Sequence, residues 1–170
     1  MCVSDYAVSS YTPTLTALLT PPPPIPVADS FKMMVVIQPE RTGYLPLSNT
    51  IIELRKIMER VPAQYLVKLG TPTAPAYVDT VYSHFPSSYI AHIACHGKQN
   101  FNNPLESALV LADGELMVSR IMAQPMPNAS LAFLSACQTA MGDENLPEEA
   151  IHLAATLLFA GFRGVVATMW

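Results

Sequence analysis

YIAHIACHG, residues 89–97, is an apolar run that ends directly on a polar, reactive side chain. A second run, LAFLSAC at residues 131–137, ends in the same way. A buried strand that ends on such a residue places it at the rim of a sheet, where open α/β folds keep their sites. If the two runs are neighbouring parallel strands, their ends lie about 5 Å apart. The two runs therefore predict a nucleophilic pair formed by His96 and Cys137.

The composition favours one domain with a large core. The chain has 170 residues, of which 51% are hydrophobic and 13% are charged. This balance is typical of strands buried on both faces, as in a parallel sheet covered by helices. The net charge is −4 and the basic residues are scattered, so we expect no nucleic-acid partner.

The termini and the cysteines indicate an intracellular, cytoplasmic and soluble domain. Three cysteines cannot form a closed disulfide framework, and the first residues lack the basic and apolar regions of a secretory signal. The longest apolar stretch, residues 151–170, carries His152 and is interrupted by the sequence GFRG at 161–164. It predicts a helix, a turn and a strand, and we expect no membrane partner.

Strand and helix patterns alternate along the chain. Predicted strands cover residues 32–37, 65–69, 89–96, 129–136 and 164–169, and predicted helices cover residues 48–61, 74–85 and 147–160. Asp113-Gly114 indicates a small hairpin, and a proline-rich loop covers residues 21–26. The alternation predicts an α/β fold with a mostly parallel sheet. Because no element follows the last strand, we expect the domain to be incomplete at its C-terminal end.

Two of the helices have defined faces. Ile51, Leu54, Met58 and Val61 are expected to form the buried face of the first helix. The helix at 147–160 is apolar almost all round after Glu149, which predicts burial on every side.

Alternation along the strand separates the residues near His96. His92, Ala94 and His96 share one face, whereas Cys95 points to the other. Cys95 is therefore expected to be a small buried hydrophobic residue. We interpret His92 as a core histidine with a polar partner, with an orienting role in the site as the alternative.

The chemistry of the pair depends on its neighbours. A cysteine with an ordinary pKa near 8.5 is only a few per cent thiolate at neutral pH, and an adjacent imidazolium lowers that pKa. We expect the backbone N–H groups of Gly97 and Cys137 to bind an oxyanion, because strand pairing should have ended at both. The alternative is that His96 merely ends a strand and Cys137 merely fills the core.

A zinc site is the competing chemistry. The candidate ligands are His92, Cys95, His96, Cys137 and His152. Strand alternation divides the first three between two faces, and the chain has no Cys-x-x-Cys pair. We therefore expect no metal and no other cofactor.

Several motifs occur together in a defined order. They are SSYTPTL at 9–15, HG at 96–97, NPLESA at 103–108, DG at 113–114, LSACQTAMGD at 134–143, EAIHLA at 149–154, FAGFR at 159–163 and VVATMW at 165–170. This set resembles the CHAT domain, a caspase-like and separase-like cysteine peptidase module often attached to tetratricopeptide repeats. The resemblance covers residues 3–170, and the wording of the motifs is most similar to fungal members.

The resemblance implies a caspase-like three-layer α/β/α sandwich with His96 and Cys137 as the catalytic dyad. It implies a polypeptide substrate and partner domains such as tetratricopeptide repeats. Such domains continue past the strand that ends here at Trp170, so we expect substrate-binding elements to be missing from this chain. An acidic cluster follows Cys137, and within it Asp143 is a candidate receptor for a basic substrate side chain. The alternative is that Asp143 stabilises a turn.

Two functions follow from these observations. The first is a cysteine endopeptidase in regulated proteolysis or signalling, and the second is an inactive scaffold that keeps the fold for binding. The presence of both His96 and Cys137 favours the enzyme, whereas an incomplete C-terminal region favours inactivity of this chain alone.

Overall fold

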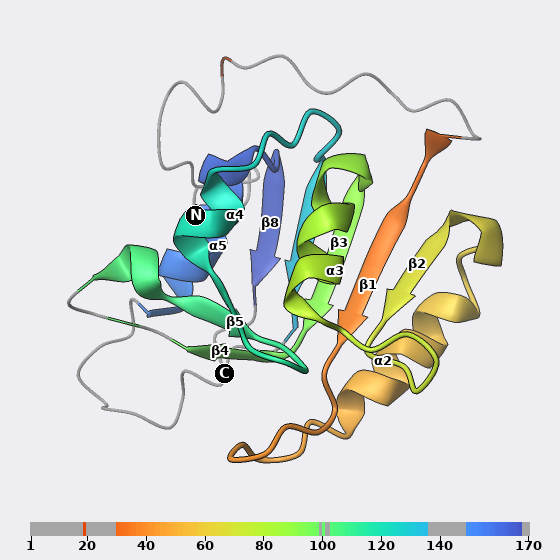
Figure 1. Cartoon of the computed structure of the whole chain (residues 1–170). Helices are drawn as coiled ribbons and strands as arrows, with labels where there is room; N and C mark the ends of the chain where they lie inside the picture. Colours follow the sequence, from red (N-terminus) through yellow and green to blue (C-terminus); the bar gives the residue numbers. More distant parts are fainter. Residues whose placement is uncertain (1–18, 20–29, 99, 101–102, 136–148, 168–170) are drawn as a thin grey trace, which may run out of the picture.

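A computed structural model describes residues 19, 30–98, 100, 103–135 and 149–167 of the chain. A five-stranded sheet with the order β2-β1-β3-β7-β8 forms its centre (Figure 1). The strands are β1 (Met33–Ile37), β2 (Leu66–Leu69), β3 (Ile90–Ala94), β7 (Leu131–Leu134) and β8 (Gly164–Ala167). Every pair of neighbours in this sheet is parallel, as the apolar runs of the sequence predict.

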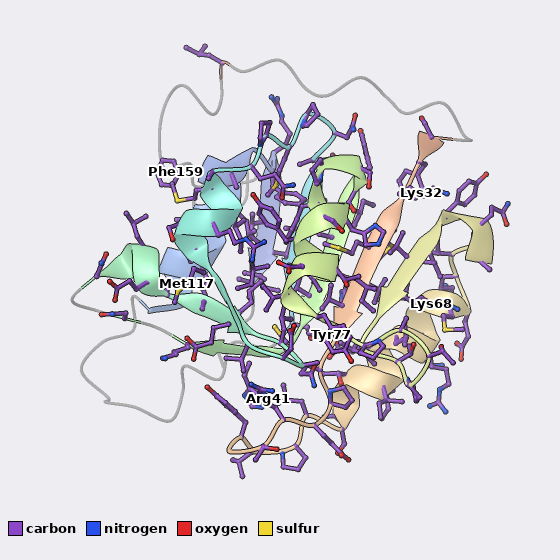
Figure 2. All side chains as sticks on the ribbon, in the orientation of Figure 1. Lys32, Arg41, Lys68, Tyr77, Met117 and Phe159 are labelled. Carbon is purple, nitrogen blue, oxygen red and sulfur yellow. The ribbon has the colours of Figure 1, made fainter. Side chains whose placement is uncertain are left out.

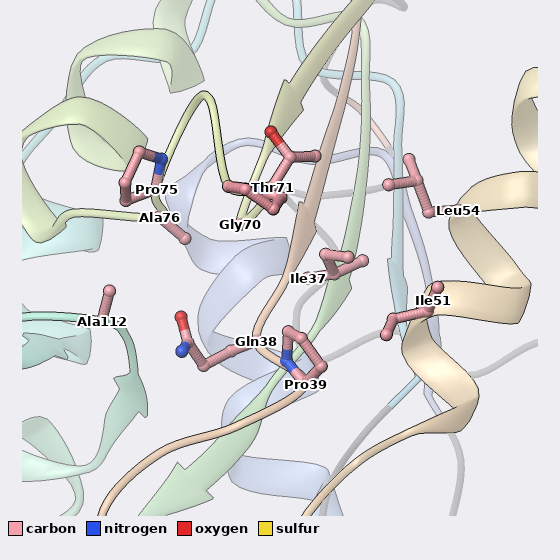
Figure 3. Close-up of a pocket in the computed structure, with 11 residues that line it drawn as sticks. Ile37, Gln38, Pro39, Ile51, Leu54, Gly70, Thr71, Pro75, Ala76 and Ala112 are labelled. Atoms are coloured by element: carbon pink, nitrogen blue, oxygen red, sulfur yellow. The ribbon is translucent and has the colours of Figure 1, made fainter.

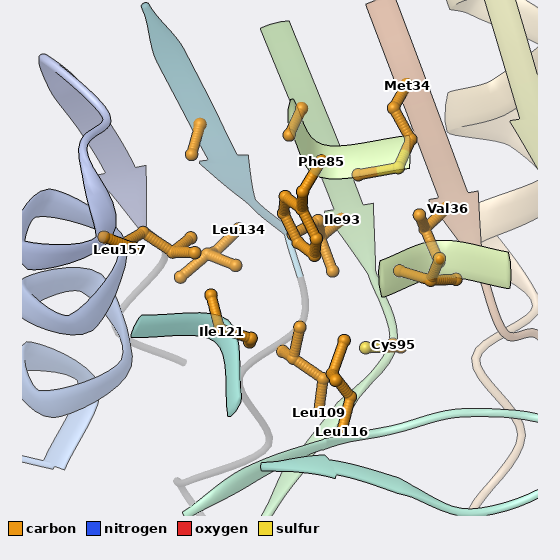
Figure 4. Packing of buried hydrophobic residues seen from close by; sticks show 14 of the residues in the cluster. Met34, Val36, Phe85, Ile93, Cys95, Leu109, Leu116, Ile121, Leu134 and Leu157 are labelled. Carbon is orange, nitrogen blue, oxygen red and sulfur yellow. The ribbon is translucent and has the colours of Figure 1, made fainter. Parts of the chain in front are cut away.

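Helices cover the two faces of this sheet. On one face Met34, Ile93 and Leu134 belong to a large buried cluster. That cluster also contains Val81 of α3 (Val78–His84), Ile121 of α4 (Val118–Met122) and Leu157 of α5 (Glu149–Ala160), as Figure 4 shows in part. On the other face a smaller cluster joins Val35, Ile37 and Ala94 to Leu54 of α2 (Asn49–Met58). The fold is therefore a caspase-like α/β/α sandwich with a mostly parallel sheet.

A second, three-stranded sheet lies at the lower edge of the first (Figure 1). It is antiparallel and consists of β4 (His96–Lys98), β5 (Ala108–Val110) and β6 (Glu115–Met117). The Asp113-Gly114 turn joins β5 and β6, where Leu111 N donates to Gly114 O at 2.8 Å. The expected hairpin is confirmed.

The first helix buries a different face from the expected one. Ile51 and Met58 are 55% and 48% exposed, whereas Thr50 and Leu54 are buried. Ile57 packs with Leu54 on the smaller cluster, so the inward face follows the spacing i, i+4 and i+7 from Thr50. Because the helix ends at Met58, Val61 lies outside it.

The last helix is not buried on every side. Leu153 and Leu157 are buried, but Phe159 is 54% exposed and lies on the periphery of the molecule (Figure 2). α5 contacts α4 and β8, so one side of it remains available to solvent. Among the described residues, no helix has both the length and the apolar character that a membrane span requires.

Candidate active site

His96 lies just past the carboxyl end of the central strand β3. β3 and β7 are parallel neighbours, with Ile93 opposite Leu134. The ladder continues for one step, because Ser135 N donates to Ile93 O at 2.9 Å. The strand that leads to Cys137 therefore runs beside the strand that leads to His96. Cys137 itself lies outside the described residues, as does Asp143.

The loop after β1 holds the imidazole of His96. The ring is 2% exposed, and its Nε2 lies 2.8 Å from the carbonyl oxygen of Leu45. The ring of Tyr44 lies 4.9 Å from the imidazole, centroid to centroid. Because a carbonyl oxygen only accepts hydrogen bonds, Nε2 carries the proton. In the neutral ring Nδ1 is then the acceptor and the site for a proton.

Hydrogen bonds within this loop fix the position of Leu45. Leu47 N donates to Pro39 O at 2.8 Å, and Tyr44 N donates to Arg41 O at 3.0 Å. The Arg41 guanidinium donates to the carbonyl oxygen of Ala112, on the turn before β6. Sequence reasoning missed the contribution of Tyr44 and Leu45, since no motif marks a loop that acts through a backbone carbonyl.

The chain does not stop pairing at His96. It leaves the main sheet after Ala94 and enters β4 at His96, where Gly97 pairs with Leu109 of β5. The premise that pairing ends at Gly97 is therefore wrong. A Cβ at Gly97 would lie 2.9 Å from Leu153 Cδ1, the end of a side chain of α5 that would have to shift to accommodate it.

His92 is a buried histidine with partners on both sides. Its Nε2 lies 2.9 Å from Glu53 Oε2, and its ring stacks on Phe133 at 5.1 Å with an interplanar angle of 9°. Burial lowers the pKa of His92, and this effect exceeds the opposing influence of the Glu53 carboxylate. The interpretation as a core histidine with a polar partner is confirmed.

Cys95 packs on the opposite face from His92. It is 1% exposed and belongs to the large cluster with Leu109 and Leu116 (Figure 4). The expectation of a small buried residue is confirmed. In the described part of the chain, no group of three or more His, Cys, Asp or Glu residues is placed to hold a metal ion.

The parallel sheet and the helices on both of its faces agree with the expected caspase-like fold. The family model of the CHAT domain matches residues 2–170, and this match indicates a caspase-like domain of the peptidase type. The chain belongs to the CHAT domain family. No curated protein matches the chain.

Proposed function

We propose that this domain is a cysteine endopeptidase that uses His96 and Cys137. The observation that carries the proposal is the hydrogen bond of His96 Nε2 to Leu45 O, 2.8 Å long. This bond leaves Nδ1 as the nitrogen that can accept a proton, and His96 follows the strand that pairs with the one leading to Cys137. A base held in one tautomer next to a thiol is the arrangement that activates a cysteine nucleophile.

In the proposed reaction Nδ1 of His96 accepts the thiol proton of Cys137. The thiolate attacks the scissile carbonyl carbon, a C–S bond forms, and the carbonyl oxygen becomes an oxyanion. Collapse of this intermediate breaks the C–N bond, and the imidazolium donates its proton to the leaving amine. Water then attacks the thioester with His96 as base, which releases the acid and restores the thiol.

We propose backbone N–H groups of Gly97 and Cys137 as the oxyanion donors. β4 is an edge strand of the second sheet, since only β5 pairs with it among the described residues. In an antiparallel pair alternate residues direct their N–H groups away from the partner strand. An edge position therefore allows Gly97 to offer a donor although it lies within the ladder.

The substrate in this proposal is a polypeptide, and Asp143 is the candidate receptor for an Arg or Lys side chain at the cleaved bond. Regulated proteolysis in the cytoplasm, with tetratricopeptide-repeat partner domains, is the biological setting we propose for it. Peptides that differ only in Arg, Lys, Asp or Leu before the cleaved bond test this specificity. Equal cleavage of all four would exclude Asp143 as a specificity residue.

An inactive scaffold is the second candidate, and the burial of His96 is the observation that favours it. A ring that is 2% exposed reaches a substrate only if Nδ1 faces the cleaved bond.

A peptide library incubated with the domain, either as this chain or within a longer protein, separates the two candidates. The endopeptidase proposal predicts cleavage products by mass spectrometry, and their loss in Cys137→Ala. Cys95→Ala is the matched control, because Cys95 is buried on the other face of the sheet. Cleavage that survives in Cys137→Ala would refute the proposal, and absence of cleavage in every form would favour the scaffold.

A further inference from the structure

The ring of Tyr44 stacks against the imidazole of His96. The two ring centroids are 4.9 Å apart and the ring planes form an angle of 35°, which describes a tilted stack. His96 is buried, whereas Tyr44 is 38% exposed and belongs to neither hydrophobic cluster. The packing of Tyr44 therefore concerns the candidate site more than the core of the domain.

A tight turn sets the position of Tyr44. Tyr44 N donates to Arg41 O at 3.0 Å, which closes a four-residue turn over residues 41–44. The third residue of this turn is Gly43, whose φ of +86° is close to the value that a type II turn requires there. A Cβ at Gly43 would meet no atom within 4 Å, so glycine serves the backbone conformation of the turn alone.

Hydrogen bonds connect this turn to the sheet that contains His96. The Arg41 guanidinium donates to Ala112 O, and Ala112 N donates to Ala76 O at 3.0 Å. Ala76 and Ala112 both line a pocket of about 470 Å³ at this edge of the molecule (Figure 3). Ala112 lies between β5 and β6, and His96 begins β4 of the same sheet. The turn is thus anchored by contacts that do not involve the side chain of Tyr44.

The hydrogen bond from His96 Nε2 to Leu45 O selects the tautomer only while the ring stays in place. The torsion about the Cβ–Cγ bond of a histidine is broad, and one hydrogen bond restrains only the Nε2 end of the ring. A contact on the face of the ring restricts its tilt, and Tyr44 supplies such a contact. If the ring moved away from Leu45 O, either nitrogen could carry the proton.

We propose that Tyr44 is a positioning residue for His96. The face of its ring keeps the imidazole in the orientation in which Nε2 donates to Leu45 O and Nδ1 remains unprotonated. Because the ring makes this contact, the phenolic hydroxyl is not required for it. The inference rests on the proposed endopeptidase function, in which Nδ1 takes the thiol proton.

The first test reads the tautomer of His96 by NMR. The Cys137→Ala chain, labelled with ¹⁵N, is studied at about pH 7.5, where an ordinary imidazole is neutral. Long-range ¹H–¹⁵N correlations distinguish a protonated from an unprotonated ring nitrogen. This chain and its Tyr44→Phe variant should show Nε2 protonated and Nδ1 unprotonated. In Tyr44→Ala both nitrogens should have the intermediate shifts of mixed tautomers.

A single tautomer in Tyr44→Ala, or mixed tautomers in Tyr44→Phe, would overturn the proposal. Tyr77→Ala is the matched control, because Tyr77 is also a largely exposed tyrosine, at 47%, and lies at the start of α3. It should leave the tautomer unchanged. A change as large as that in Tyr44→Ala would contradict a specific role of Tyr44.

A direct measurement of the contact covers the case in which Tyr44→Ala does not fold, as judged by circular dichroism. The ring protons of Tyr44 and His96 should then show nuclear Overhauser effects in the chain with Tyr44 intact. Their presence, with one tautomer retained in Tyr44→Phe, would support the proposal. Their absence would refute it.

Alkylation of Cys137 connects the orientation of His96 to reactivity. In chains that retain Cys137, Tyr44→Ala should slow labelling by iodoacetamide about threefold to tenfold, the effect of losing one aromatic contact. Tyr44→Phe should label at the parent rate. Mixed tautomers with unchanged labelling in Tyr44→Ala would keep the positioning role and reject the dyad. Slower labelling with a single tautomer would reject the positioning role alone.

Discussion

The imidazole of His96 is hydrogen-bonded through Nε2 to the backbone carbonyl of Leu45, a residue 51 positions earlier in the chain. The contact joins the end of the central strand to the loop after β1. It determines which nitrogen of the ring carries the proton, and the partner is a backbone carbonyl where an acidic side chain could have had the same role. The site thus depends on the geometry of a loop as much as on the residue types at the strand ends.

Stability should fall below about pH 6.5 because His92 is held neutral in the core. Burial lowers the pKa of His92 in the folded chain below its value in the unfolded chain. As pH falls, the unfolded state therefore binds this proton first, and the free energy of unfolding decreases through the folded-state pKa. Urea unfolding at about pH 7.5 and about pH 5.5 measures the change.

His92→Gln should reduce the loss of stability between these two pH values. His84→Gln is the matched control, because His84 is only partly buried and lies at the end of α3. An unchanged pH dependence in His92→Gln would show that His92 does not cause it.

Gly70→Ala should destabilise the domain severely. Gly70 directly follows β2 and has φ +93°. A Cβ there would lie 1.7 Å from the carbonyl oxygen of Ile37, the last residue of β1. The backbone of β1 would have to move, in addition to the cost of a left-handed conformation for alanine, about 1–2 kcal/mol. Thermal unfolding by circular dichroism measures the loss.

Gly43→Ala provides the comparison for that prediction. Gly43 has φ +86°, but a Cβ added there would meet no atom within 4 Å, so only the conformational cost applies. We expect a loss of about 1–2 kcal/mol, clearly smaller than that of Gly70→Ala. Equal losses in the two variants would contradict the close approach at Gly70.

Leu157→Ala should cost about 2–5 kcal/mol of unfolding free energy, because it leaves a cavity in the large cluster. Leu157 is 1% exposed, whereas Phe159 on the same helix is 54% exposed. Phe159→Ala should therefore change the stability much less. If chemical denaturation gave similar losses for both, this orientation of α5 would be wrong.

The sequence predicts the fold well where one face or both faces of an element are buried. The apolar runs that form β1, β3 and β7 contain one polar residue, His92. Its partner, Glu53, belongs to α2, which lies elsewhere in the sequence. The prediction for the buried face of α2 is right for Leu54 and wrong for Ile51 and Met58, because all three side chains are apolar. Only the position of the helix on the sheet decides which of them is buried.

The candidate site is predictable only in part. His96 follows from its place at a strand end, but the carbonyl of Leu45 carries no side-chain signal. Contacts of this kind depend on the packing of loops and are invisible to periodicity or motif.

The proposed activation of the Cys137 thiol by His96 can be measured by alkylation of that thiol. Iodoacetamide labelling from about pH 5 to about pH 9, with the adduct located by mass spectrometry, gives the pH dependence for each cysteine. Buried Cys95 serves as the internal reference for an inaccessible thiol. We predict rapid labelling of Cys137 well below pH 8.5, slowed in a folded His96→Gln variant. Labelling of Cys137 with the pH dependence of an ordinary thiol, unchanged in that variant, would show that His96 does not activate it.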